Sequence, residues 1–358
     1  MKNIIVLFGG RSTEHEISLR SARNVLNELD RSRYRVYGVY LDKQGRFLPL
    51  GEITAPLEKP KDLIRTSSLS RLESIADFCR FAAQLDQAVA FPVIHGQTGE
   101  DGEIQGFLQM LGIPYVGAGL TASALCMDKG FANHVFRDCG IPEARFVVLT
   151  RSEYANADPD VLFPSIVEQC GPSCFVKPAN NGSSVGVMRA TEHTLREAIE
   201  NAFRYDQRIV IEEEIIGCEL EVSILGNADA KASRPGSYTT TREMLDYTAK
   251  YNDRQTVENV PHPLSEEKTN QLRELALRAY RAAGCEGLAR VDIFMDKDEN
   301  FFVNEINTMP GMTPTSLASK LWTALTDMTF PEYLDAIIAY AEESAQRRAS
   351  IETTWGQK

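Results

Sequence analysis

Two short segments near the carboxyl end of the chain carry side chains suited to metal and phosphate chemistry. Arg290 and Asp292 alternate in one strand-like run. A turn of loop-favouring residues follows at 296–300, and a second run then carries Glu305 and Asn307. Because alternate side chains of a strand share a face, a hairpin can gather three oxygen ligands and one guanidinium on one side. Oxygen ligands without Cys or His select a hard cation such as magnesium, particularly one shared with phosphates.

A solvated edge hairpin is the commoner reason for two alternating strands, and it is the alternative here. The residues between the polar ones argue against it, because they are apolar and must pack against something. These residues are Val291, Ile293, Phe302 and Ile306. The second run leads into a loop at 307–313, where Pro310 and Gly311 suit exposed backbone amides. Together these features favour a metal site.

A Gly/Ser-rich turn after Lys177 has the composition of a phosphate-binding lid. Residues 182–186 are small, which leaves their backbone amides free to surround a phosphate chain. Val185 and Val187 resume a strand pattern, so a hairpin is predicted instead of the GxxxxGK and helix of a Walker loop. Lys177 would supply a point charge for phosphate oxygens. A plain hairpin turn is the alternative, which the predicted metal hairpin makes less favourable.

A predicted strand at 209–216 could hold a nucleotide base. The edge of such a strand offers backbone donors and acceptors to an adenine ring, and Glu219 could accept hydrogen bonds from ribose hydroxyls. A solvated acidic linker is the usual explanation for such a segment, so this signal is weak by itself.

Three segments are expected to position these residues, in an α/β protein with α+β elements. Residues 1–120 alternate strand and helix, which is typical of an open parallel sheet with ligand loops at the carboxyl ends of its strands. Residues 121–216 and 217–348 are expected to form two α+β domains, with 349–358 as a frayed tail, and the polar stretch from Ser344 onward is expected to begin the fraying. The elements expected are strands at 4–8, 34–40, 88–94 and 219–225, helices at 16–29, 123–138, 192–203 and 265–283, an irregular excursion at 48–70 and a polar loop at 237–257.

Composition limits the classes of function. The 358 residues are 43% hydrophobic and 25% charged, as in a soluble globular protein of two or three domains. A formal net charge of −12 argues against a nucleic-acid surface, which is usually basic. No apolar run approaches the roughly 18 residues that span a bilayer, and the first residues predict a strand and not a signal peptide. Seven scattered cysteines without a CxxC indicate incidental thiols in a reducing cytosol.

Taken together, these motifs resemble the D-alanine–D-alanine ligase family of the ATP-grasp enzymes. The resemblance extends from about residue 3 to residue 343. The stretches that carry it are 9–18, 95–106, 127–129, 177–186, 250–251 and 290–316. Val303 stands where a leucine or isoleucine is usual in the family, and the 48–70 excursion varies among relatives. Neither departure touches a functional position.

The resemblance implies a three-domain ATP-grasp fold, with ATP between the second and third domains and the substrates between the first and third. It implies ATP-dependent ligation of two D-alanines through a D-alanyl phosphate, for peptidoglycan precursors. The implied enzyme is a cytoplasmic homodimer that uses a pair of magnesium or manganese ions. The implied ATP-binding residues are Lys129, Lys177, Ser184, Glu212, Glu213, Ile215, Glu219 and Lys250, and the implied metal ligands are Asp292, Glu305 and Asn307.

The family also implies roles around the substrates. Glu14 would bind the ammonium of the first D-alanine with His95 nearby, although a histidine before a glycine is as often a structural loop residue. The remaining implied residues are Ser183 and Tyr251, which would close the site towards Glu14, Arg290 and the Gly311 amide, which would hold the oxyanion, and Ser316 and Leu317, which would receive the second carboxylate. The loop at 237–257, which carries Lys250 and Tyr251, is expected to exclude water.

Four alternatives stay open. A different ATP-grasp carboxylate–amine ligase, or a D-alanine–D-lactate or D-serine variant, would share most of these motifs. Tyr251 favours the dipeptide, because relatives that make the D-lactate ester have histidine in the corresponding loop. A dinucleotide-dependent oxidoreductase is suggested by Gly9 and Gly10, but GxGxxG is absent. A non-catalytic nucleotide-binding module would not need Arg290, Asp292 and Glu305 together.

Overall fold

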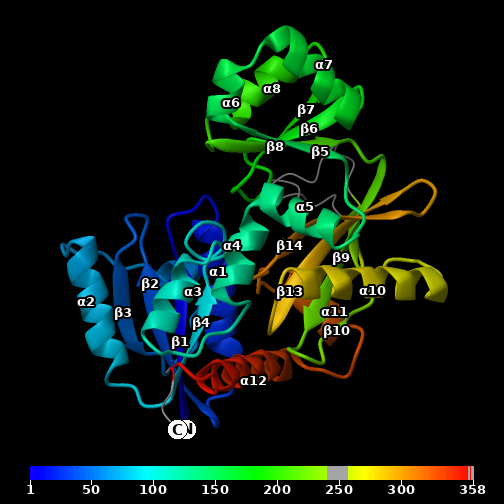
Figure 1. Ribbon diagram of the computed structural model, residues 1–358. Helices are drawn as coiled ribbons and strands as arrows, with labels where there is room; N and C mark the ends of the chain where they lie inside the picture. The colour runs from blue at the N-terminus through cyan, green and yellow to red at the C-terminus, as the bar shows by residue number, and fades with distance from the viewer. Residues whose placement is uncertain (240–256, 354, 356–358) are drawn as a thin grey trace.

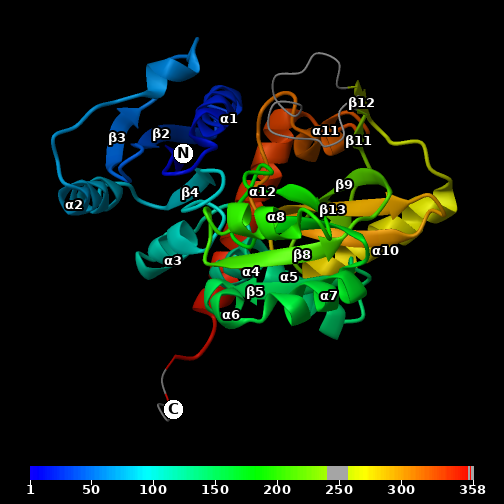
Figure 2. The same cartoon turned by 90° about the horizontal axis from the view of Figure 1, so that it is seen from above.

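The computed structural model describes residues 1–239, 257–353 and 355. Its three larger sheets fall one into each of the three expected segments (Figure 1). Figure 2 shows the first sheet set to one side of the other two. The mixed α/β class is confirmed. No helix in the described part of the chain is long and apolar enough to cross a membrane, and all seven cysteines are free thiols.

The first sheet has the order β3-β2-β1-β4, with β1 parallel to both of its neighbours and β3 antiparallel to β2. Its strands are β1 (Lys2–Gly9), β2 (Tyr34–Leu41), β3 (Phe47–Glu52) and β4 (Ala88–Val93). The helices are α1 (His15–Glu28), α2 (Arg71–Ala82) and α3 (Glu103–Met110), with a 3-10 turn η1 at Pro60–Leu63. Buried residues of α1 pack on one face of this sheet, and those of α2 and α3 on the other. Because β1 and β4 are adjacent and parallel, the loops at their carboxyl ends lie together.

All but the first residue of strand β3 lies within the stretch that was expected to be irregular, so that expectation is wrong for 48–52. The run contains Pro49 and Gly51, which usually weaken a strand. Both are tolerated because β3 is an edge strand that pairs with β2 alone. Phe47 anchors the strand by packing its ring against Phe78 of α2, with 5.2 Å between the ring centroids.

The central sheet is antiparallel throughout, in the order β5-β8-β6-β7. Its strands are β5 (Phe146–Thr150), β6 (Ser173–Pro178), β7 (Met188–Thr191) and β8 (Arg208–Glu213). The helices are α6 (Arg151–Asn156), α7 (Pro159–Cys170) and α8 (Leu195–Ala202). Buried residues of α7 and α8 cover one face of the sheet.

Two helices form where a single one was expected at 123–138, namely α4 (Leu120–Met127) and α5 (Lys129–Asp138). Asp128 makes the break, because its backbone is extended and its Oδ1 accepts from the N–H of Phe131 as an N-cap. Arg208 of β8 lies 2.8 Å from the other oxygen of the same carboxylate. The break puts Lys129 at the start of α5. Buried residues of both helices pack on the third sheet, and α5 also contacts the central sheet, where His134 lies against Phe146 of β5 with 5.1 Å between the ring centroids.

The third sheet is antiparallel, in the order β10-β9-β13-β14, and a small pair, β11-β12, lies beside it. Its strands are β9 (Gly217–Leu225), β10 (Lys231–Ala232), β13 (Leu288–Asp296) and β14 (Phe301–Asn307), and the small pair is β11 (Ser237–Thr239) and β12 (Val257–Asn259). The helices are α10 (Glu266–Ala282), α11 (Leu317–Thr323) and α12 (Phe330–Ala349). Helix α10 packs on the apolar face of this sheet.

Helix α12 ties the third segment to the first. Its buried residues join the same apolar cluster as β1, β2 and α1, and Figure 1 shows the helix running along the lower edge of both parts. Ser344 is 5% exposed and its hydroxyl lies 3.2 Å from Asn227 Oδ1. The chain therefore stays helical past Ser344, where fraying was expected, because this face of α12 is buried.

Candidate active site

The hairpin of β13 and β14 has the register that a shared polar face requires. Arg290 pairs with Asn307, and Asp292 pairs with Glu305. Directly opposed residues of an antiparallel pair lie on the same face of the sheet. The predicted convergence of these four side chains is therefore confirmed.

The other face of the hairpin lies in the apolar cluster of the third sheet. Val291, Ile293 and Ile306 are at most 4% exposed. Phe302 was expected with them, but Val303 takes that place and is 2% exposed. The reason is an irregularity after Asp292 that shifts the register by one residue.

Arg290 and Asp292 form a bidentate ion pair. Nε and Nη2 of Arg290 donate to Oδ1 and Oδ2 of Asp292, each at 2.6 Å. Glu221 of β9 lies 3.2 Å from the same Nε. Burial raises the pKa of Asp292 to about 7, against the lowering effect of the Arg290 charge. This part of the site is acidic and enclosed, and one guanidinium is held between two carboxylates.

The oxygens around this pair fit a hard cation. Asn307 Oδ1 is buried and has no hydrogen-bond partner among the described residues. Glu305 lies opposite Asp292 and its Oε2 is 3.1 Å from Lys129 Nζ. In the described part of the chain no three His, Cys, Asp or Glu side chains form a metal site of their own. Two carboxylates and an amide instead suit a metal that completes its shell with phosphate oxygens and water.

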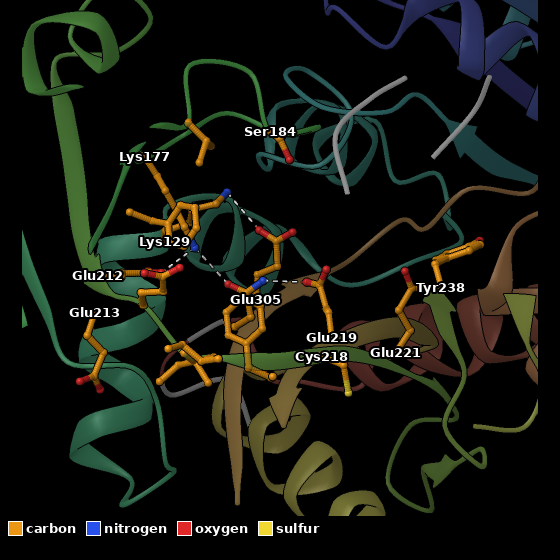
Figure 3. A pocket seen from close by; sticks show the side chains of 18 of the residues that line it. Lys129, Lys177, Ser184, Glu212, Glu213, Cys218, Glu219, Glu221, Tyr238 and Glu305 are labelled. Atoms are coloured by element: carbon orange, nitrogen blue, oxygen red, sulfur yellow. Dashed lines mark hydrogen bonds and ion pairs between the residues drawn. The ribbon is translucent and has the colours of Figure 1, made fainter. Parts of the chain in front are cut away.

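A cavity of about 560 Å³ lies beside the hairpin, between the central and third sheets (Figure 3). Two lysines reach it from different elements. Lys129 Nζ donates to the Asn181 carbonyl oxygen at 2.9 Å, and Lys177 Nζ to Glu212 Oε2 at 2.5 Å. Burial acts to lower the pKa of Lys177, but the charge and hydrogen bond of Glu212 outweigh it and raise the pKa. Lys177 therefore remains a cation in an enclosed place.

The structure divides the acidic residues of 212–219 into different surroundings. Both oxygens of Glu212 accept hydrogen bonds, from Lys177 and from Asn133 Nδ2 at 2.9 Å. The Glu213 carboxylate is held by Arg145 at 2.6 Å, and its backbone N–H donates to the Arg145 carbonyl oxygen at 2.9 Å. Ile215, Glu219 and Ser184 also line the cavity. All the ATP-binding residues predicted at described positions therefore border one space.

The lid between β6 and β7 has a longer loop than predicted. Val185 and Val187 were expected to resume a strand, but β7 begins at Met188. Ser183 and Ser184 have φ values of 51° and 58°, a left-handed conformation that is costly for residues with a side chain. Consecutive left-handed residues direct the chain into a loop, which explains why the strand starts later.

The lid reaches the loop between β1 and α1. Ser183 Oγ donates to Glu14 Oε1 at 2.6 Å, across 169 positions of sequence. Glu14 lies in the loop after β1, where Gly9 and Gly10 have φ values of 94° and 99°. A Cβ at Gly9 would lie 2.1 Å from the Leu41 carbonyl oxygen, so only glycine fits there. A smaller cavity of about 80 Å³ lies at this junction.

His95 lies at the carboxyl end of β4 and lines the smaller cavity with Glu14. Its Nδ1 is 3.2 Å from the Met309 carbonyl oxygen and 3.6 Å from Glu100 Oε1, and its Nε2 is 3.0 Å from Ser21 Oγ. Burial acts to lower the pKa of His95, but Glu100 and the charge of Glu14 outweigh it and raise the pKa. Burial also raises the pKa of Glu100, despite the hydrogen bond to His95. This pair can hold a proton next to Glu14.

Of the remaining predicted residues at described positions, Gly311 borders a cavity, whereas Ser316 and Leu317 do not. Gly311 lines the smaller cavity together with Arg290. Ser316 Oγ lies 2.8 Å from Thr313 Oγ1, and Leu317 is 1% exposed at the start of α11, so only its backbone could meet a ligand. Neither borders the two cavities. Lys250 and Tyr251, with most of the predicted closing loop, lie outside the described residues.

The two cavities share a wall. The residues that line both are Lys129, Asn181, Gly182, Ser183 and Glu305. They come from the lid, from the start of α5 and from the hairpin of β13 and β14. A group bound at this end of the larger cavity would therefore face a molecule in the smaller one.

Three residues of the site were not singled out from the sequence. Glu221 follows Glu219 by two positions, so strand alternation could have placed it on the same face. Glu100 falls within the 95–106 motif, but only the structure brings it to His95. Asn304 enters the larger cavity through the irregularity in β14, for which the sequence carries no signal.

Comparisons with family descriptions and with individual proteins agree on one family. The family descriptions "D-ala D-ala ligase N-terminus" and "D-ala D-ala ligase C-terminus" match residues 3–118 and 135–339. A D-alanine–D-alanine ligase of Finegoldia magna is 43% identical over 348 residues, or 97% of each chain. D-alanine–D-alanine ligase A of Chromobacterium violaceum is 41% identical over 355 residues, or 95% of each chain.

Solved structures agree over the whole length. The D-alanine-D-alanine ligase from Coxiella burnetii is similar with a TM-score of 0.79 at 32% identity, covering 98% of this chain and 97% of that one. The VanG D-Ala:D-Ser ligase from Enterococcus faecalis is similar with a TM-score of 0.79 at 29% identity, covering 95% of this chain and 99% of that one.

Proposed function

Since the chain belongs to the D-alanine–D-alanine ligase family of ATP-grasp enzymes, we propose that its cleft joins two D-alanine molecules at the expense of ATP. ATP occupies the larger cavity, with its phosphates towards the wall shared with the smaller one. The first D-alanine lies in the smaller cavity. The product, D-alanyl-D-alanine, serves as a peptidoglycan precursor.

The chemistry explains why the site needs its cations. A carboxylate resists attack by an amine because it is anionic and lacks a good leaving group. Transfer of the γ-phosphoryl group to the carboxylate of the first D-alanine removes both obstacles, but it brings two anions together. Lys129 and Lys177 offset this repulsion by holding phosphate oxygens, since catalysis of phosphoryl transfer consists mainly of positioning and charge stabilisation. The amine of the second D-alanine then displaces phosphate from the acyl phosphate.

Asp292, Glu305 and Asn307 would hold magnesium or manganese beside these phosphates. The buried Oδ1 of Asn307, which has no partner among the described residues, supports this assignment. Such ions, as a pair in this family, supply charge neutralisation on the phosphates.

Residues around the smaller cavity orient the substrates. Glu14 binds the ammonium of the first D-alanine, and the 2.6 Å hydrogen bond from Ser183 holds the lid on that carboxylate. Arg290 suits the oxyanion of the tetrahedral intermediate, because its guanidinium is always charged and rigidly forked. The Gly311 amide would share this oxyanion. Ser316 and the Leu317 backbone would receive the carboxylate of the second D-alanine.

The shared wall of the two cavities is the observation that carries this proposal, because it puts the phosphate end of a nucleotide next to a small site lined by Glu14 and His95. ADP release should be measured with ATP, magnesium and a panel of D- and L-amino acids, D-serine and D-lactate. Release with D-alanine alone, with D-alanyl-D-alanine identified by mass spectrometry, supports the assignment. Release that needs an L-amino acid would overturn it.

The similarity to a D-Ala:D-Ser ligase makes a mixed dipeptide the second candidate. The same panel separates the two, because a D-alanyl-D-serine ligase would favour D-serine as the second substrate when both amino acids compete. We also propose that the enzyme acts in the cytoplasm, where ATP is available, and as a homodimer. Light scattering of the purified protein tests the dimer.

A further inference from the structure

Strand β14 carries one more residue than β13 within the metal hairpin. Asp292 pairs with Glu305, whereas the next residue, Ile293, pairs with Val303. Asn304 is therefore the extra residue of a β-bulge, a feature that redirects a side chain. It lines the nucleotide cavity next to Glu305, although alternation along a regular strand would turn it to the other face.

The Asn304 amide uses both of its ends. Nδ2 donates to Glu219 Oε1 at 2.9 Å, and Oδ1 accepts from Lys177 Nζ at 3.3 Å. Dashed lines in Figure 3 follow these contacts from Lys177 to Glu219. Glu219 belongs to β9 of the third sheet and Lys177 to β6 of the central sheet, so the amide spans the cleft between two domains.

An amide suits this place for a simple reason. A carboxylate needs a donor and an ammonium needs an acceptor, and a neutral amide offers both from one short side chain. Aspartate at this position would repel Glu219, and leucine would leave both charged groups without this partner. Lys177 would keep its ion pair with Glu212, at 2.5 Å.

We propose that Asn304 is a positioning residue for the nucleotide, which holds the Glu219 carboxylate towards the ribose hydroxyls and Lys177 towards the phosphates. The inference rests on the proposed placement of ATP. It adds that the bulge fixes the separation between the sugar-binding and phosphate-binding groups. Asn304 then contributes to nucleotide affinity and to recognition of the ribose without contacting the reacting atoms.

Discrimination between ATP and its 2′-deoxy and 3′-deoxy analogues is the test. The full-length enzyme is assayed for kcat/KM with each nucleotide, as wild type, Asn304→Leu and Glu219→Ala. We expect wild type to prefer ATP and Asn304→Leu to lose most of that preference. The KM for ATP should rise about tenfold, as for loss of a hydrogen bond to a charged group, while the KM for D-alanine stays within about twofold. Asn304→Ser, whose hydroxyl is too short to reach both partners, replaces Asn304→Leu if that variant does not fold.

The possible outcomes separate the positioning role of Asn304 from the proposed ATP site. Loss of the preference in both the Asn304 and Glu219 variants supports the inference. Loss in Glu219→Ala alone, or an Asn304 variant that weakens all three nucleotides equally, overturns the role of Asn304 and leaves the proposed ATP site intact. If neither variant changes the preference, the ribose role of Glu219 is wrong and the inference fails with it.

Discussion

The ion pair of Lys177 and Glu212 lies in the larger cavity, which we propose as the nucleotide site, and its contribution to stability can be tested directly. Nζ lies 2.5 Å from Oε2, and the two residues are 9% and 4% exposed. Glu212→Gln keeps the shape of the side chain and removes its charge. Burial is the largest single influence on the Lys177 pKa and acts to lower it, so the pKa should fall once the Glu212 charge is gone.

The stability lost in Glu212→Gln can be estimated because the ion pair is buried. Removing one partner of a buried ion pair costs about 3–5 kcal/mol, because the other charge is left uncompensated. The lower end, about 3 kcal/mol, applies here because Lys177 keeps the Asn304 oxygen at 3.3 Å and gains the new amide oxygen. A bound triphosphate should recover about 1.5 kcal/mol, the contribution of a hydrogen bond to a charged group.

Hydrogen exchange of β6 and β8 is the appropriate assay, because it reports the local opening free energy of the central sheet and not of the whole chain. The matched control is Glu213→Gln, one residue along β8. Its partner Arg145 has a side chain that is 60% exposed, and an exposed pair contributes about 1 kcal/mol or less. Exchange is compared with and without a non-hydrolysable ATP analogue at saturation.

Two results would refute this reasoning. If the two glutamine variants lose protection equally, the enclosure of Lys177 does not set the cost. If the analogue protects β6 and β8 no more in Glu212→Gln than in wild type, the phosphates do not reach Lys177, and its assignment as a phosphate-binding residue fails.

Three further predictions concern other parts of the site. Glu305→Ala should abolish ADP release while the protein stays folded by circular dichroism, because a proposed metal ligand is lost, and near-normal turnover would overturn that role. Ser183→Ala should raise the KM for the first D-alanine about tenfold by removing the 2.6 Å bond to Glu14, and an unchanged KM in steady-state kinetics would contradict it. Glu100→Gln should lower the pKa of His95 below its ordinary 6.5, because burial would no longer be outweighed. An NMR titration that finds this pKa still raised would show that Glu100 is not the cause.

The polar face of the metal hairpin could be predicted because strand alternation is a local rule. Arg290 and Asp292, like Glu305 and Asn307, stand two positions apart, and the polar turn between the runs fixes the pairing. The same rule failed at Phe302, because the bulge at Asn304 resets the alternation beyond it. A bulge depends on how the strand meets its neighbours, and nothing in the local pattern of apolar residues indicated one.

Long-range contacts explain two other differences between the prediction and the structure, the helix break at Asp128 and the burial of Ser344. Asp128 interrupts an otherwise continuous helical pattern, and the break is stabilised by Arg208, which lies 80 positions later in strand β8. The sequence pattern around 123–138 cannot contain that contact. Ser344 lies in a polar stretch, yet it is buried because α12 packs on the first domain. A prediction of fraying from polarity alone was therefore wrong at Ser344.

The charges of the site follow one arrangement that explains how it can bind so charged a ligand. Lys177 with Glu212, Lys129 with Glu305 and Arg290 with Asp292 each place a cation, which we propose to hold phosphate or oxyanion, against a carboxylate. Nucleotide phosphates bring new anions to the cations, and a divalent metal brings new positive charge to Glu305 and Asp292. For the pairs of Lys129 with Glu305 and Arg290 with Asp292, binding then exchanges partners and leaves no buried charge alone, which avoids the large penalty of an uncompensated ion. Nucleotide and metal should accordingly bind together with higher affinity than either binds alone.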